Sequence, residues 1–198
     1  YVRDAHENAE KMWNAVLEAG EEFGLMVIAP AHHRRIAAGI LSWGQDLDHE
    51  TSPFQVNLAY QVPRNKAADY IGKEALEKQR AIIDEGNAPF KMKMVGITFG
   101  GKEITDYAPD FWLIEDTDGN EMGYVTSPWW SPELETNIGL AWVPWSSSEV
   151  GTKLQVKLPE EYSDGGPAQG EVVEVPFRES VNPNKREVQK AKGLDYAD

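Results

Sequence analysis

The pattern of apolar and polar positions divides this chain into a helical first part and a strand-rich second part. Apolar residues recur at helical spacing in three stretches, residues 4–19, 31–43 and 69–85. From residue 90 onward, short apolar runs alternate with turn-forming residues, as is typical of antiparallel strands. The sequence therefore predicts an α+β protein in which helices precede a small antiparallel β-barrel or β-sandwich.

The first of these helices has the clearest pattern. Asp4 is expected to cap its N-terminus together with Glu7, and Gly20 is expected to end it. The apolar run at residues 25–28 predicts a short strand or an extended link, after which Pro30 opens the second helix. The inner face of the third helix is expected to contain Ala75, Leu76, Gln79, Ile82 and Ile83.

The second part of the chain predicts a series of short strands. Met92 and Met94 alternate with lysines, and the residues from Val95 to Phe99 continue in the opposite phase, which predicts a strand that changes its buried face. The Asp-Gly turn within residues 116–120 predicts a hairpin, and its spacing does not fit an EF-hand calcium loop. Further strands are expected at residues 138–143, 153–158 and 171–177.

Residues 35–76 form the junction between the two parts. Within them a helix gives way to a polar, acidic loop at residues 44–52, and an apolar run follows at 54–62. Because the chain begins at Tyr1 rather than at Met, we expect it to be the C-terminal piece of a longer protein. The expected division is the end of a larger region at residues 1–86, a β-rich domain at 87–178 and a polar tail at 179–198.

Composition argues against several classes of function. The formal charge is −14, which makes a nucleic acid or an anionic membrane surface a poor partner. The chain has no Cys, which excludes disulfides, thiolate nucleophiles and Cys-based metal sites. His32 and His33 are adjacent and point about 100° apart on a helix, so no metal site is expected. Without a bilayer-length apolar run or a signal peptide, the protein is expected in the cytoplasm.

The sequence shows no Ser-His-Asp order, no metal-ligand spacing and no phosphate-binding Gly loop. Its most conspicuous chemical feature is a high aromatic content, with seven Trp and seven Tyr. Most of these rings are expected to pack in the core. Trp129 and Trp130 cannot both point the same way in an extended chain, so one of them is expected near the surface or a cleft.

A series of short motifs runs in order along the chain. In the first part they are RIAAG at 35–39, WGQD at 43–46, TSPF at 51–54 and DYIGKEAL at 69–76. In the second part they are GYVTS at 123–127, SPEL at 131–134, NIGLA at 137–141, GT at 151–152 and VPF at 175–177. This ordered series resembles the glycine-cleavage T-protein superfamily of folate-dependent methyl and aminomethyl transferases.

Within that superfamily the chain is most similar to the dimethylsulfoniopropionate demethylases. Ala37 stands where the T-protein pattern has a glutamate, and Ala31-His32 stands where it has an arginine followed by Asp. By contrast, Arg35-Ile36, Asp46 and the stretch from Gly151 to Lys157 match the demethylase pattern.

The resemblance implies that a methyl group moves from a sulfonium donor to N5 of tetrahydrofolate. A sulfonium methyl needs no covalent nucleophile, so the protein's task is to align donor and acceptor. Aromatic faces attract a sulfonium through cation–π interactions, and an arginine suits a substrate carboxylate. The resemblance also places most of the folate pocket in an N-terminal half, which is the expected partner of this chain; a homodimer is left open.

The candidate pocket residues are Trp43 and Tyr60, which precede and follow the acidic loop at residues 44–52, called the junction loop below. Arg35 is the candidate positive charge for a substrate carboxylate. Core or interface packing is the competing interpretation for all three, and no catalytic residue is assigned. Other functions left open are an aminomethyltransferase of glycine cleavage, an aromatic O-demethylase, a non-catalytic folate-binding protein and a purely structural module. The folate-binding relatives carry a Cys-containing motif in this region, which the chain lacks.

Overall fold

The computed structural model describes residues 4–28, 31–64 and 66–177. Contacts divide the chain into two compact units, residues 1–31 and 32–198, which are described separately. The predicted polar tail at residues 179–198 lies outside the described residues. The expected domain boundaries after residues 86 and 178 stay predictions.

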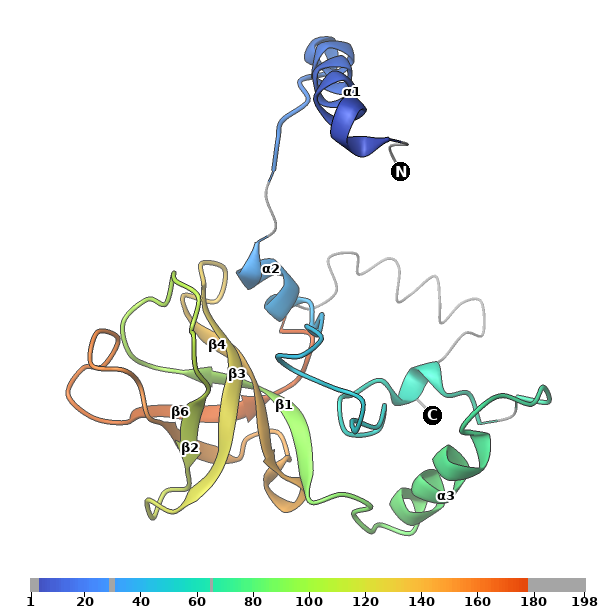
Figure 1. Ribbon diagram of the computed structural model, residues 1–198. Helices are drawn as coiled ribbons and strands as arrows, with labels where there is room; N and C mark the ends of the chain where they lie inside the picture. The colour runs from blue at the N-terminus through green and yellow to red at the C-terminus, as the bar shows by residue number, and fades with distance from the viewer. Residues whose placement is uncertain (1–3, 29–30, 65, 178–198) are drawn as a thin grey trace. The chain divides into compact units, whose positions relative to one another are not determined.

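The first unit is helical (Figure 1). Helix α1, Ala5–Gly20, confirms the predicted first helix, and the 3-10 turn η1, Glu21–Phe23, continues it. Its apolar stripe is open to solvent within this unit, since the side chains of Met12, Trp13 and Val16 are each about half exposed.

The predicted bounds of α1 agree with the structure to within one residue, but the predicted caps were wrong. Asp4 has a φ of 52°, and its side chain makes no capping hydrogen bond. Gly20 lies inside the helical path, and the chain leaves that path at Gly24, whose φ of 67° places it in the left-handed region that glycine tolerates. Of the two alternatives expected for residues 25–28, the strand is not formed, and these residues are an irregular link.

The second helix, α2, covers His32–Ala37 and is shorter than the predicted span of residues 31–43. Gly39, with a φ of 68°, turns the chain away, and the backbone N–H of Phe177 donates to the Ala37 carbonyl at 2.9 Å. The C-terminal edge of the barrel domain thus stabilises the end of α2. After the 3-10 turn η2, Ala59–Gln61, helix α3 runs over Lys73–Asp84.

Helix α3 begins later than predicted and buries less of its expected inner face. Leu76, Gln79 and Ile83 are half-buried, whereas Ala75 and Ile82 are exposed.

The second part of the chain forms a closed β-barrel with the strand order β1-β4-β3-β2-β5-β6 (Figure 1). Every neighbouring pair is antiparallel, which confirms the predicted α+β class with a small antiparallel barrel. The predicted hairpin around residues 116–120 joins β2 and β3. The strands are β1 Met92–Phe99, β2 Trp112–Glu115, β3 Glu121–Ser131, β4 Thr136–Pro144, β5 Lys153–Val156 and β6 Ala168–Val173, with the 3-10 turn η3, Trp145–Ser147, after β4.

Two apolar clusters lie on opposite faces of the same strands. Val95 and Ile97 of β1 belong to the cluster that also contains Ile114, Leu154 and Val156 from strands β2 and β5, so this cluster fills the barrel interior. Met94 of β1 belongs instead to the cluster with Ile36 of α2, Val56, and Ile138, Leu140 and Trp142 of β4. The change of phase in the β1 sequence is therefore explained, because β1 is buried on both faces.

Asn137 of β4 fastens a loop to the barrel. Its fully buried amide donates to the carbonyls of Gly100 and Lys102 at 3.2 and 3.0 Å, and it accepts from the Ile104 N–H at 3.2 Å. These bonds satisfy backbone groups that the ladder leaves unpaired.

Replacing Asn137 with Ala is expected to lower the free energy of unfolding by roughly 2–3 kcal/mol, because several backbone groups lose their partner. Urea unfolding followed by circular dichroism measures this change. The exposed Asn87→Ala is the matched control and should leave stability nearly unchanged. Equal midpoints for the two variants would show that Asn137 does not hold the loop.

Candidate functional site

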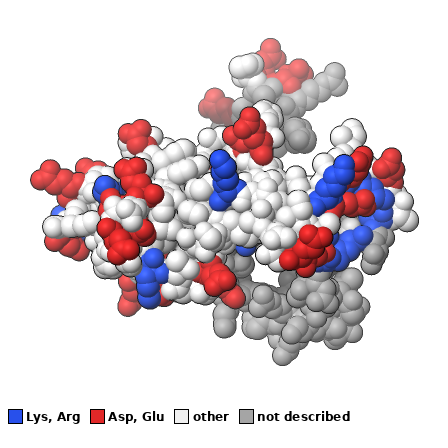
Figure 2. Space-filling view, turned by 90° about the horizontal axis from the view of Figure 1, so that it is seen from below, with Lys and Arg blue, Asp and Glu red and all other residues white. Residues whose placement is uncertain are grey.

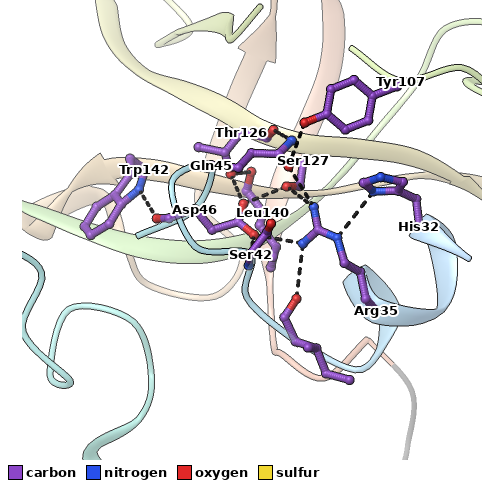
Figure 3. Close-up of polar contacts among 11 residues, drawn as sticks. His32, Arg35, Ser42, Gln45, Asp46, Tyr107, Thr126, Ser127, Leu140 and Trp142 are labelled. Atoms are coloured by element: carbon purple, nitrogen blue, oxygen red, sulfur yellow. Dashed lines mark hydrogen bonds and ion pairs between the residues drawn. The ribbon is translucent and has the colours of Figure 1, made fainter. Parts of the chain in front are cut away.

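The candidate site is built on the junction loop, which is held against the barrel by the buried carboxylate of Asp46 (Figure 3). Its Oδ2 accepts from Arg35 Nη1 at 2.8 Å and from the Ser42 N–H at 2.7 Å. Its Oδ1 accepts from the hydroxyls of Thr126 and Ser127, each at 2.6 Å. A carboxylate with this many donors is well compensated for its loss of water.

A β-bulge makes this arrangement possible. The register between β3 and β4 shifts between Val125 and Ser127, so Thr126 is an extra residue in β3. Adjacent side chains of a regular strand point to opposite faces, whereas a bulge changes the direction of one of them. Thr126 and Ser127 therefore both reach the same carboxylate oxygen of Asp46.

Arg35 of α2 uses all five of its N–H groups within the described residues, since the guanidinium has five donors and makes five hydrogen bonds. Besides Asp46, its acceptors are His32 Nδ1, the Ile40 carbonyl, Gln45 Oε1 and Ser127 Oγ. A substrate carboxylate could bind Arg35 directly only by displacing one of them. The geometry favours a positioning role for Arg35.

The loop is also anchored through its backbone and through Gln45. Trp142 of β4 donates from Nε1 to the Asp46 carbonyl at 2.9 Å. Gln45 donates from Nε2 to the Thr126 carbonyl at 2.7 Å, and its Oε1 accepts from the Tyr107 hydroxyl at 3.1 Å. The loop is thus fixed to β3, to β4 and to the segment between β1 and β2.

Trp43 and Tyr60, the predicted pocket residues, are exposed on the surface. The side chain of Trp43 is 61 % exposed, and its ring meets the His49 ring edge-on at 4.7 Å. Tyr60 is 58 % exposed and accepts at its hydroxyl from Gln61 Nε2 at 3.2 Å. Among the described residues, no hydrogen bond or ring contact joins Arg35, Trp43 and Tyr60 to one another. Their shared role in a pocket stays a prediction.

Sequence reasoning missed Thr126, Ser127 and Gln45, although all three lie in the motifs that carry the resemblance. Their neutral side chains give no signal of contact with a loop some eighty residues earlier in the chain. The sequence shows Asp46 as part of a motif but gives no sign that it is the centre of a network.

Charge is mixed on one face of the molecule, although the chain as a whole has a net charge of −14. In the face shown in Figure 2, acidic and basic side chains are interspersed around a broad area of other residues.

No described group of three or more His, Asp or Glu residues could hold a metal ion. Within the described residues, no helix has the length and apolarity needed to cross a bilayer.

Replacing Asp46 with Ala is expected to destabilise the protein by about 3–5 kcal/mol, because Arg35 would remain largely buried without its counter-charge. Thermal and urea unfolding measure the loss. Asp84→Ala breaks the exposed Arg64–Asp84 pair and should have a much smaller effect. Similar losses in the two variants would contradict the central role of Asp46.

His32 gives the same network a pH dependence. Burial lowers the pKa of His32 from its ordinary value of 6.5, the Arg35 charge adds to this, and Asp46 opposes it. The unfolded chain therefore binds a proton at His32 more readily than the folded chain does. Stability from this group is complete above pH 6.5 and is lost as the pH falls from 6.5 through the folded pKa.

We expect His32→Gln, which cannot titrate but keeps an acceptor for Arg35, to flatten the fall in melting temperature between pH 7.5 and 5 relative to the unmodified protein. Thermal melts across this range give the comparison. Parallel curves would mean that protonation of His32 does not weaken the network.

The chain matches two family profiles in succession. Residues 2–66 match the GCVT N-terminal domain, and residues 92–178 match the glycine cleavage T-protein C-terminal barrel domain. The second match spans the barrel strands, and the first includes α2 and the loop around Asp46.

Relatives named aminomethyltransferase are similar over most of this chain. The protein from Geobacillus sp. (strain WCH70) is 34 % identical over 154 residues, which is 77 % of this chain and 40 % of the relative. The protein from Chloroherpeton thalassium is 29 % identical over 175 residues, 87 % of this chain and 44 % of the relative. The chain thus spans less than half of the length of these relatives.

The solved structure of glycine cleavage system aminomethyltransferase T from Bartonella henselae has a similar fold. It matches with a TM-score of 0.58 and 23 % identity, over 74 % of this chain and 37 % of that one.

The two profiles occur in the same order as the two groups of motifs, and the relatives carry the same family name. Both profiles and these relatives support the glycine-cleavage T-protein superfamily as the family of this chain.

Proposed function

We propose that this chain is the C-terminal part of a tetrahydrofolate-dependent methyltransferase that takes a methyl group from a sulfonium donor such as dimethylsulfoniopropionate. The observation that carries the proposal is the exposed Trp43 ring on a loop fixed by the buried Arg35–Asp46 pair. A rigidly presented aromatic face is suited to attract a cationic donor without a large ordering cost.

The roles in this proposal differ among the three candidate residues. Trp43 and Tyr60 line the pocket with their exposed rings. Arg35 has a positioning role, because its hydrogen bond to Asp46 fixes the loop that carries Trp43. The sulfonium group brings its own leaving group, a neutral thioether. The contribution of the protein is then to align the donor methyl with its acceptor.

Tetrahydrofolate supplies the acceptor nitrogen N5 when it is bound. The described residues fit the outer part of such a site, because exposed aromatic rings such as Trp43 and Tyr60 can pack against flat heteroaromatic groups. We propose that the remaining contacts to the folate come from an N-terminal half, as the share of the relatives covered by this chain suggests.

We propose that this N-terminal half also covers apolar surface that the described chain exposes. Met12 and Trp13 on α1 are about half exposed, and Met26 and Ile28 after it are exposed to more than three quarters. Large apolar residues gathered in one short segment are typical of an interface rather than of a free surface. A homodimer is the other way to cover them.

Aminomethyl transfer in glycine cleavage is the second candidate, because the relatives carry that name. The residue at position 37 argues for the sulfonium donor instead. Ala37 replaces the glutamate of the T-protein pattern and is buried in the apolar cluster outside the barrel. A carboxylate is therefore missing from a position where the aminomethyltransferase pattern has one.

The test is a donor panel with the full-length protein that carries this sequence. Dimethylsulfoniopropionate and tetrahydrofolate are expected to give 5-methyltetrahydrofolate. Chromatography of the reaction mixture measures the formation of this product. Formation of 5,10-methylenetetrahydrofolate from an aminomethylated carrier protein, with no reaction of the sulfonium, would replace this proposal by aminomethyl transfer. Methyl transfer from a methoxylated aromatic alone would indicate an O-demethylase.

Within that assay, Trp43→Leu and Tyr60→Leu are expected to lower kcat/KM by roughly 2- to 30-fold each, the equivalent of one cation–π contact. Trp43→Phe and Tyr60→Phe keep an aromatic face and should retain most of the activity. If the Leu variants fold normally and keep unchanged kinetics, neither ring belongs to the pocket.

A further inference from the structure

A second feature of the junction loop is a surface pocket that the proposed methyl transfer does not use. It has a volume of about 340 Å³ and lies between the loop and strands β1, β3 and β4. This volume is at the lower end of the ~300–1,000 Å³ typical of ligand pockets, so it suits a small molecule. Trp142 is its most buried apolar lining residue, and Leu47 and Met92 are partly buried.

One side of the pocket is formed by a pair of stacked aromatic rings. The rings of Phe111 and Tyr124 lie 5.3 Å apart between centroids with an angle of 16° between their planes. Phe111 is 52 % exposed, which is a large exposure for an apolar ring on a barrel. The negative faces of aromatic rings attract cations.

Besides the ion-paired Asp46, two further acidic residues of the loop, Asp48 and Glu50, line the same pocket. The Oδ1 of Asp48 accepts from the Glu50 N–H at 2.9 Å and from the Thr51 hydroxyl at 3.0 Å, which fixes the orientation of the carboxylate. Neither Asp48 nor Glu50 forms an ion pair with a cationic side chain in the described part of the chain. Burial raises the pKa of Tyr124, and the Asp48 charge adds to this, so the field of Asp48 reaches the aromatic side of the pocket.

We propose that this pocket binds a small organic cation of the quaternary-ammonium type, with its charge between the Phe111–Tyr124 pair and the carboxylates of Asp48 and Glu50. Aromatic rings and uncompensated carboxylates around one small cavity select a positive charge that is bulky and weakly hydrated. A compact, strongly hydrated metal ion would lose its water without enough oxygen ligands to replace it. A neutral ligand would gain nothing from the two charges.

The pocket shares Gln45 and Asp46 with the candidate site, but the groups proposed to bind the cation are different from those proposed for methyl transfer. The proposed cation-binding carboxylates lie on the loop beyond Asp46, and neither Trp43 nor Tyr60 lines the pocket. Binding here is therefore expected whether or not the protein transfers methyl groups to folate.

The test compares choline with its neutral isostere 3,3-dimethylbutan-1-ol, at constant ionic strength, on the full-length protein. Isothermal titration or Trp fluorescence should show saturable choline binding, with the isostere weaker by roughly fivefold or more. Equal affinity for the two compounds, or no saturable binding of choline, would overturn the proposal.

Two variants locate the site. Phe111→Leu and Glu50→Gln should each weaken choline binding by roughly fivefold. Their matched controls, Phe23→Leu and Glu149→Gln, change exposed residues that do not line the pocket and should leave binding unchanged. Binding that is insensitive to both pocket variants would place the cation elsewhere and refute the assignment.

Discussion

The ion pair between Arg35 and Asp46 is the interaction on which the junction depends. The Asp46 side chain is 0 % exposed, and that of Arg35 is 18 % exposed, so both groups have given up most of their water. Such a pair is stable only if the remaining donors and acceptors are satisfied. Here the Asp46 carboxylate accepts from four donors and every N–H of Arg35 is used, so the pair has one well-defined geometry.

This requirement connects three elements that are distant in the sequence. Helix α2 supplies Arg35, the loop supplies Asp46, and the bulge in β3 supplies the hydroxyls of Thr126 and Ser127. The apolar cluster around Ile36 and Trp142 lies beside the network and excludes water from it. Packing and polar satisfaction therefore act together, and neither would fix the loop without the other.

Because these contacts fix the loop, the loop can present side chains to a ligand in a defined arrangement. An anchored loop can hold exposed groups, such as the Trp43 ring and the carboxylates of Asp48 and Glu50, without the entropic cost of ordering them when a ligand binds. The family relationship accounts for the barrel fold, and folate-dependent group transfer is the activity proposed from it. Ala37, at which this chain departs from the T-protein pattern, is buried in the apolar cluster beside the loop.

The sequence by itself determined the elements whose pattern is local. The helical stripe of α1, the Asp-Gly hairpin and the two phases of β1 could all be recognised, because each depends on the spacing of neighbouring residues. The tertiary structure alone decided that α2 ends at Ala37, where Phe177 and Gly39 end it, and that Asp46 meets Thr126 and Ser127. These outcomes depend on strand register and on a single inserted residue in β3, and long-range pairing of this kind leaves no periodic signal in the chain.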